Sequence, residues 1–200
     1  MRNIKNTFEI FVLSLALALS QATFAAAHEK KVMGEMKLDN ALSALSFVSI
    51  KKGTVGEAHS INNLSGSISP EGNISVVLDL SSVDTKIDIR NDRMKKHLFE
   101  TSANPTATIT AKVGNKISVA GVSIVEGEVS INLHGTTKTV PVSVAVINTG
   151  SQVVISSTKP IIIKADDYGM AEGVAMLQKL AKLPSIATAV PVNFVLTFSK

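Results

Sequence analysis

Apolar and polar residues alternate along most of the chain, a period-two pattern that predicts half-buried β-strands. The clearest series lies near the C-terminus, where Phe194 and Leu196 share one face of the predicted strand. Ile74, Val76 and Leu78 form a second such face, rich in the β-branched residues that favour strands. In all, the pattern predicts eight or nine strands, at 30–38, 43–51, 55–68, 73–82, 105–113, 116–133, 137–147, 151–163 and 188–199.

Two segments instead have helical spacing, at 88–99 and at 171–183, where Pro184 follows. No long alternation of strand and helix interrupts the strands, so we expect an antiparallel sheet in one domain. Within the predicted strand 116–133 the alternation slips near 120–121, which predicts a β-bulge. Many strands must close on themselves or pair face to face to remove free edges. The pattern alone leaves both a barrel and a sandwich open.

The first 27 residues have the pattern of a secretory signal peptide rather than of a folded element. Arg2 and Lys5 precede a short apolar run at 10–19, and three alanines follow at 25–27. Such a run, about 15 Å long as a helix, cannot cross a bilayer core of about 30 Å. We therefore expect export, cleavage after residue 27 and a folded domain at 28–200, with no stable membrane insertion.

Composition narrows the possible chemistry. The chain has no cysteine, which excludes disulfides, thiolate metal sites and thiol catalysis. Its formal charge of +4 is too small and too evenly spread to predict a nucleic-acid partner. No nucleophile elbow, phosphate-binding loop or metal-binding histidine pair is present, so no enzyme activity, catalytic residue, metal or cofactor is predicted. The single histidines and the pairs Asp84/Asp88 and Asp166/Asp167 are interpreted as structural groups.

Seven segments, taken in order, resemble those of the YceI-like family and together span about 35–198. They are 45–52 (LSFVSIKK), 58–68 (AHSINNLSGSI), 80–85 (LSSVDT), 90–99 (RNDRMKKHLF), 104–109 (NPTATI), 133–140 (LHGTTKTV) and 167–170 (DYGM). The resemblance implies an all-β fold, a single antiparallel eight-stranded lipocalin-like barrel with one or two short helices. It also implies a periplasmic protein that binds a polyisoprenoid or another long-chain lipid.

From the resemblance and the apolar faces we predict a set of ligand-binding residues. They are Phe47, Ile74, Val76, Leu78, Arg90, Arg93, Met94, His97, Phe99, Phe194 and Leu196. Arg90, Arg93 and His97 share one helix face, where guanidinium groups suit an anionic headgroup. The alternative for this face is a solvated surface paired with Asp88 and Asp92. The apolar residues are either packed core or cavity lining.

Three functions are compatible with these features of the sequence. The first is a carrier or sensor that holds a long apolar molecule in the barrel. The second is a stress-related interaction module with a filled barrel and no ligand, and the third is a small enzyme acting on a lipid. The sequence is also compatible with a homodimer.

Overall fold

The computed structural model describes residues 34–117 and 120–200, which belong to one unit, Lys31–Lys200. The predicted signal peptide, its cleavage site and the beginning of the predicted strand 30–38 lie outside the described residues. None of the described helices is both long and apolar enough to cross a membrane.

The described residues form one sheet, whose segments follow the predicted strands closely. The strands are β1 (Met36–Leu38), β2 (Ala44–Lys51), β3 (Val55–Ile61), β4 (Leu64–Ile68), β5 (Asn73–Asp79), β6 (Val83–Asp84), β7 (Thr106–Lys112), β8 (Gly121–Leu133), β9 (Thr136–Asn148), β10 (Gln152–Ser157), β11 (Ile161–Lys164) and β12 (Ala189–Ser199).

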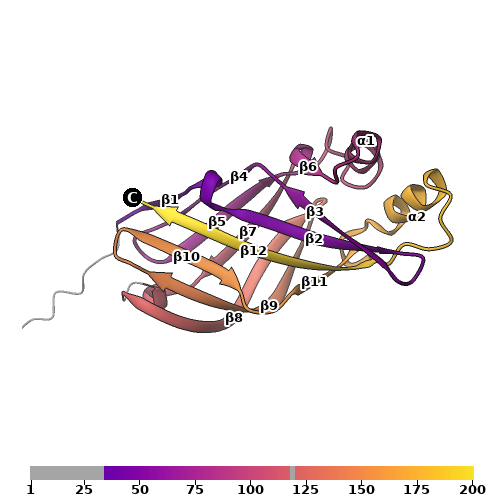
Figure 1. Ribbon diagram of the computed structural model, residues 1–200. Helices are drawn as coiled ribbons and strands as arrows, with labels where there is room; N and C mark the ends of the chain where they lie inside the picture. The colour runs from indigo at the N-terminus through magenta and orange to yellow at the C-terminus, as the bar shows by residue number, and fades with distance from the viewer. Residues whose placement is uncertain (1–33, 118–119) are drawn as a thin grey trace, which may run out of the picture. The chain divides into compact units, whose positions relative to one another are not determined.

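Eight of these strands close into an antiparallel ring in the order β1-β4-β5-β7-β8-β9-β10-β12, and β12 pairs back with β1 (Figure 1). The other strands extend ring strands across short breaks: β2 follows β1 along β12, and β11 continues β10 along the opposite edge of β12. β3 and β6 likewise continue β4 and β5. Counting each interrupted strand once, neighbours in the ring follow one another in the sequence, and the last strand closes on the first. The predicted eight-stranded antiparallel barrel is confirmed.

Aspartates mark two of the breaks. The first lies between the predicted strands 30–38 and 43–51, as expected, whereas the second replaces the end of the predicted strand 73–82. The side chain of Asp39 accepts hydrogen bonds from the backbone N–H groups of Ala41 and Leu42 and begins a 3-10 turn, η1 (Asn40–Leu42). Asp79 likewise accepts from Ser81 N and begins η2 (Leu80–Ser82). A short side-chain acceptor competes with ladder pairing, so each long strand bends at these points.

The predicted strand 116–133 and its bulge are corrected. A 3-10 turn, η3 (Gly114–Ile117), occupies its first part, and β8 begins at Gly121 with a left-handed φ of 130°. Ile117 is 1% exposed, and its carbonyl accepts a hydrogen bond of 2.6 Å from Asn148 Nδ2. Burying this side chain inside the barrel outweighs continued strand pairing.

Two helices cover one end of the barrel (Figure 1). α1 (Asp88–His97) and α2 (Ala171–Leu180) confirm the predicted helices 88–99 and 171–183, each a little shorter than expected. A 3-10 turn, η4 (Ala165–Tyr168), leads into α2. A packed core lies where β1, β4, β10 and β12 meet, formed by side chains at most 1% exposed: Met36, Ile68, Val153 and Phe198.

Candidate ligand-binding cavity

A cavity of about 260 Å³ runs inside the ring. Every ring strand from β5 to β12 contributes inward-facing side chains, because the period-two pattern turns alternate residues toward the interior. Among the described lining residues only Lys112, Glu126 and Glu128 are charged, and the rest are aliphatic, aromatic or glycine. A hollow of this kind can take an apolar chain but offers few polar partners.

The structure brings together seven of the eleven predicted ligand-binding residues on the cavity wall. They are Phe47, Ile74, Val76, Leu78, Phe99, Phe194 and Leu196. The other four, Arg90, Arg93, Met94 and His97, belong to α1 and do not line the cavity. Met94 is 5% exposed and packs in the core, whereas the other three are partly exposed.

The helix-covered end of the cavity is closed by apolar side chains. Leu98 and Phe99 follow α1, Met170 precedes α2 and Val174 lies in its first turns, and all four line the cavity. The helices meet closely, because a Cβ on Gly173 would lie only 2.5 Å from the carbonyl oxygen of His97. The two helices therefore form a tight cover over this end.

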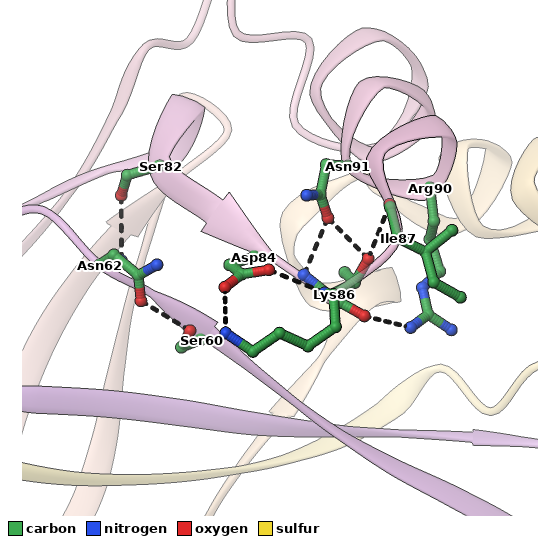
Figure 2. Close-up of polar contacts among 9 residues, drawn as sticks. Ser60, Asn62, Ser82, Asp84, Lys86, Ile87, Arg90 and Asn91 are labelled. Atoms are coloured by element: carbon green, nitrogen blue, oxygen red, sulfur yellow. Dashed lines mark hydrogen bonds and ion pairs between the residues drawn. The ribbon is translucent and has the colours of Figure 1, made fainter.

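Polar contacts fix the start of α1 against the sheet (Figure 2). Asn91 Oδ1 accepts from Thr85 N at 2.8 Å and from Thr85 Oγ1 at 2.6 Å. Arg90 Nη2 donates to the carbonyl of Thr85 at 2.5 Å, and Asp84 Oδ1 accepts from Lys86 N at 2.7 Å. Asp84 is thus a structural acceptor, as predicted, rather than half of an acid–base pair.

The guanidinium of Arg90 already has an anionic partner. Its Nη1 lies 2.7 Å from Glu57 Oε2, which Lys51 Nζ also approaches to 2.7 Å. The hydrogen bond from Lys51, followed by the charges of Arg90 and Lys51, lowers the pKa of Glu57 despite partial burial. Neither predicted arrangement, a free cationic face or pairing with Asp88 and Asp92, describes Arg90, which links α1 to the β2–β3 hairpin.

His59 is a buried structural histidine, as the sequence predicted. It is 4% exposed, its Nε2 lies 2.8 Å from Ser49 Oγ, and its ring meets the Phe47 ring edge-on at 5.3 Å. Burial, followed by the nearby charge of Arg90, lowers the pKa of His59. His59 packs beside Phe47, its partner on the neighbouring strand, and does not itself line the cavity.

The ligand-binding residues predicted from the sequence do not include several side chains that line the cavity. Val129, Ile131 and Leu133 on β8 and Val142, Val144 and Val146 on β9 all face the cavity. Their alternation is plain in the sequence and could have identified them. Met170 and Val174 had no comparable signal, because a helical apolar face does not reveal which neighbour it covers.

Comparisons with known proteins agree with this geometry. The model for the YceI-like domain matches residues 20–198. A search of curated proteins found no significant match. A solved polyisoprenoid binding domain from Saccharophagus degradans, implicated in plant cell wall breakdown, is 37% identical, with a TM-score of 0.78 over 84% of this chain and 98% of that chain.

Two further structures are similar in fold. Burkholderia cenocepacia BcnA is 21% identical, with a TM-score of 0.61 over 80% of this chain and 98% of that one. A Campylobacter jejuni YceI protein is 13% identical, with a TM-score of 0.52 over 71% of this chain and 84% of that one. The matched family model covers most of the sequence, and the barrel is the one shared by these structures. The chain therefore belongs to the family of YceI-like domains.

Proposed function

We propose that the protein is a periplasmic binding or carrier protein for a long-chain isoprenoid or similar amphiphilic lipid held in the barrel. The observation that carries this proposal is the apolar cavity itself, which larger side chains would have filled if the barrel were only a scaffold. The Saccharophagus relative, a polyisoprenoid binding domain, supports the ligand class.

The lining favours long apolar chains over short ones. Each buried methylene contributes about 0.8 kcal/mol, so a tail with about ten buried carbons gains several kcal/mol after ordering costs. We propose that the seven predicted residues on the wall contact this tail; Phe47, Phe99 and Phe194 have the largest side chains among them.

Binding rather than catalysis fits the chemistry of the wall. The described lining residues include no histidine, serine, threonine or tyrosine that could act as base or nucleophile. The carboxylates of Glu126 and Glu128 belong to exposed residues rather than to a buried acid–base pair. A lipid-acting enzyme is therefore the weaker alternative, and a filled-barrel interaction module conflicts with the cavity.

The test is to purify the protein from the periplasm of its native host, extract it with organic solvent and analyse the extract by mass spectrometry. We expect a long-chain lipid in a molar ratio near one to one, and protein that begins at His28. Light scattering on the same sample decides between monomer and homodimer. Recovery of no lipid, together with no uptake of long-chain probes by the purified protein, would contradict the carrier function.

A further inference from the structure

The barrel wall is split between β7 and β8. Pairing between these two strands covers three residue pairs, the last being Thr110 with Ser130. On its other edge β8 pairs with β9 along its whole length, from Gly121 to Leu133. β7 ends at Lys112, and its last two residues, Ala111 and Lys112, do not pair with Val129 and Glu128, which would face them in the same register.

At the split the end of β7 stays paired with β5 but is not paired with β8. Val113 N donates to the carbonyl of Gly72 at 3.0 Å. Gly72 has a φ of 80°, and a Cβ there would lie 2.2 Å from the carbonyl oxygen of Gly114. Only glycine permits this approach, and from it the chain continues into η3, which buries Ile117, instead of extending β7 along β8.

The cavity reaches solvent at this split. Four exposed residues belong to the described lining: Lys112 on β7, and Glu126, Gly127 and Glu128 on β8. All other described lining residues are buried or partly buried. If the ladder continued past Thr110 and Ser130, Lys112 would face Glu128. The exposed lining thus lies at the end of β7 and on the edge of β8 that would face it.

The chemistry of this rim suits a passage rather than a strand-pairing edge. Charged side chains on an edge strand disfavour pairing with another chain, and Lys112, Glu126 and Glu128 place three at this rim. Backbone N–H and C=O groups at an open rim are satisfied by water, so the split carries no large desolvation cost. Directly behind the rim lie apolar residues such as Val113 and Val129.

We propose that the split between β7 and β8 is a lateral portal through which the apolar chain enters and leaves the cavity, an inference that rests on the proposed lipid-binding function. The tail passes sideways between the strands and no ladder hydrogen bond has to break. The helix-covered end, closed by Phe99, Met170 and Val174, stays shut during exchange.

A reversible bridge across the split tests the portal. The chain has no cysteine, so in Lys112→Cys/Glu128→Cys the two introduced thiols are the sole ones. A short bis-methanethiosulfonate reagent joins them and a reductant releases them. The delipidated protein is mixed with the fluorescent fatty acid cis-parinaric acid, and loading and release are followed by stopped flow. We expect the bridge to slow both rates by at least about tenfold with little change in Kd, and reduction to restore them.

Thr110→Cys/Ser130→Cys is the matched control, because it joins the same strands where they are already paired. Its bridge is expected to leave both rates unchanged. Gly127→Trp provides a second, unbridged obstruction, since a Cβ at Gly127 has no neighbour within 4 Å and folding should tolerate it. Slow exchange in this variant supports the portal.

The possible results distinguish failure of the portal proposal from failure of the lipid-binding proposal. Wild-type exchange rates in both the bridged protein and Gly127→Trp, with normal Kd, would overturn the portal and leave the binding function standing. A wild-type protein that never takes up the probe and yields no lipid on extraction would overturn both.

Discussion

Arg90 lies at the junction of α1 with the sheet, where it contacts Glu57 and the carbonyl of Thr85. Replacing Arg90 with Gln removes the ion pair and leaves Glu57 with Lys51 alone. Hydrogen bonds to charged groups contribute more than exposed ion pairs, and this pair is only partly exposed, so we expect a loss of about 1 kcal/mol in the free energy of unfolding. Urea denaturation measures it.

Arg93→Gln is the control, because Arg93 is on the same helix and has no ion pair among the described residues. Its effect is expected to stay within about 0.5 kcal/mol. Neither variant should change affinity for a phosphorylated long-chain lipid, since neither residue lines the cavity. Weaker lipid binding with unchanged stability would instead restore the headgroup role predicted from the sequence.

His59 makes the folded protein sensitive to mild acid. Because burial holds its pKa below the ordinary value, the unfolded chain binds more protons than the folded one at mildly acidic pH. The stability is therefore complete above the ordinary histidine pKa of about 6.5 and declines as the pH falls below it. We expect Tm to drop between pH 7.5 and 5.5, and to drop less in His59→Gln.

Calorimetry on both proteins at the two pH values checks this expectation. The carboxylates and the other histidines are common to both proteins, so the difference isolates His59. Equal drops in the two proteins would show that the imidazole of His59 is not the acid-sensitive group. An NMR titration of its ring would then report an ordinary pKa.

At the scale of elements, the strands were predictable because their alternation is local, and so were both helices. The turn after Asp79 was not predicted, since an aspartate between apolar residues is also compatible with an outward-facing strand position. The end of β7–β8 pairing at Thr110 and Ser130 was not predictable, because beyond it the chain turns where Gly72 meets Gly114 beside the neighbouring strand β5. Contacts between residues far apart in sequence leave no periodic signal in a single chain.

The contact between α1 and α2 depends on Gly173. A Cβ there would lie 2.5 Å from the carbonyl oxygen of His97 and 3.0 Å from Leu98 Cα. Alanine favours a helix by about 1 kcal/mol over glycine. The clash opposes this gain, and it is with backbone atoms, which cannot rotate aside as a side chain can. We therefore expect Gly173→Ala to lower the free energy of unfolding by about 1–3 kcal/mol. Urea denaturation measures the change.

Gly127→Ala is the matched control, since its Cβ would meet no atom within 4 Å. Its effect is expected to stay within about 0.5 kcal/mol. If Gly173→Ala were as stable as the wild type, α2 would be free to shift on α1, and the tight cover over the cavity would not hold.

At the scale of the whole molecule, the sequence predicted the ring but not whether it is hollow. An inward-facing residue has the same pattern in a packed core and on a cavity wall. Phe194 and Phe198 show the difference, because both face inward on β12. Phe198 is 0% exposed and lies in the packed core, whereas Phe194 lines the cavity. Which role each takes depends on the volumes of all the facing side chains together.

These two phenylalanines allow the hollow barrel to be tested within one strand. Phe198→Ala removes a fully packed ring, and such changes cost about 3–5 kcal/mol. Phe194→Ala removes a ring that already borders empty space, so the lipid-free protein should lose clearly less stability. Affinity for a long-chain lipid should fall, or the preferred chain length should shift, in Phe194→Ala only. Denaturation of delipidated protein and binding of a chain-length series measure both effects. Equal losses of stability, with no lipid recovered from the wild type, would show a packed barrel and contradict the carrier function.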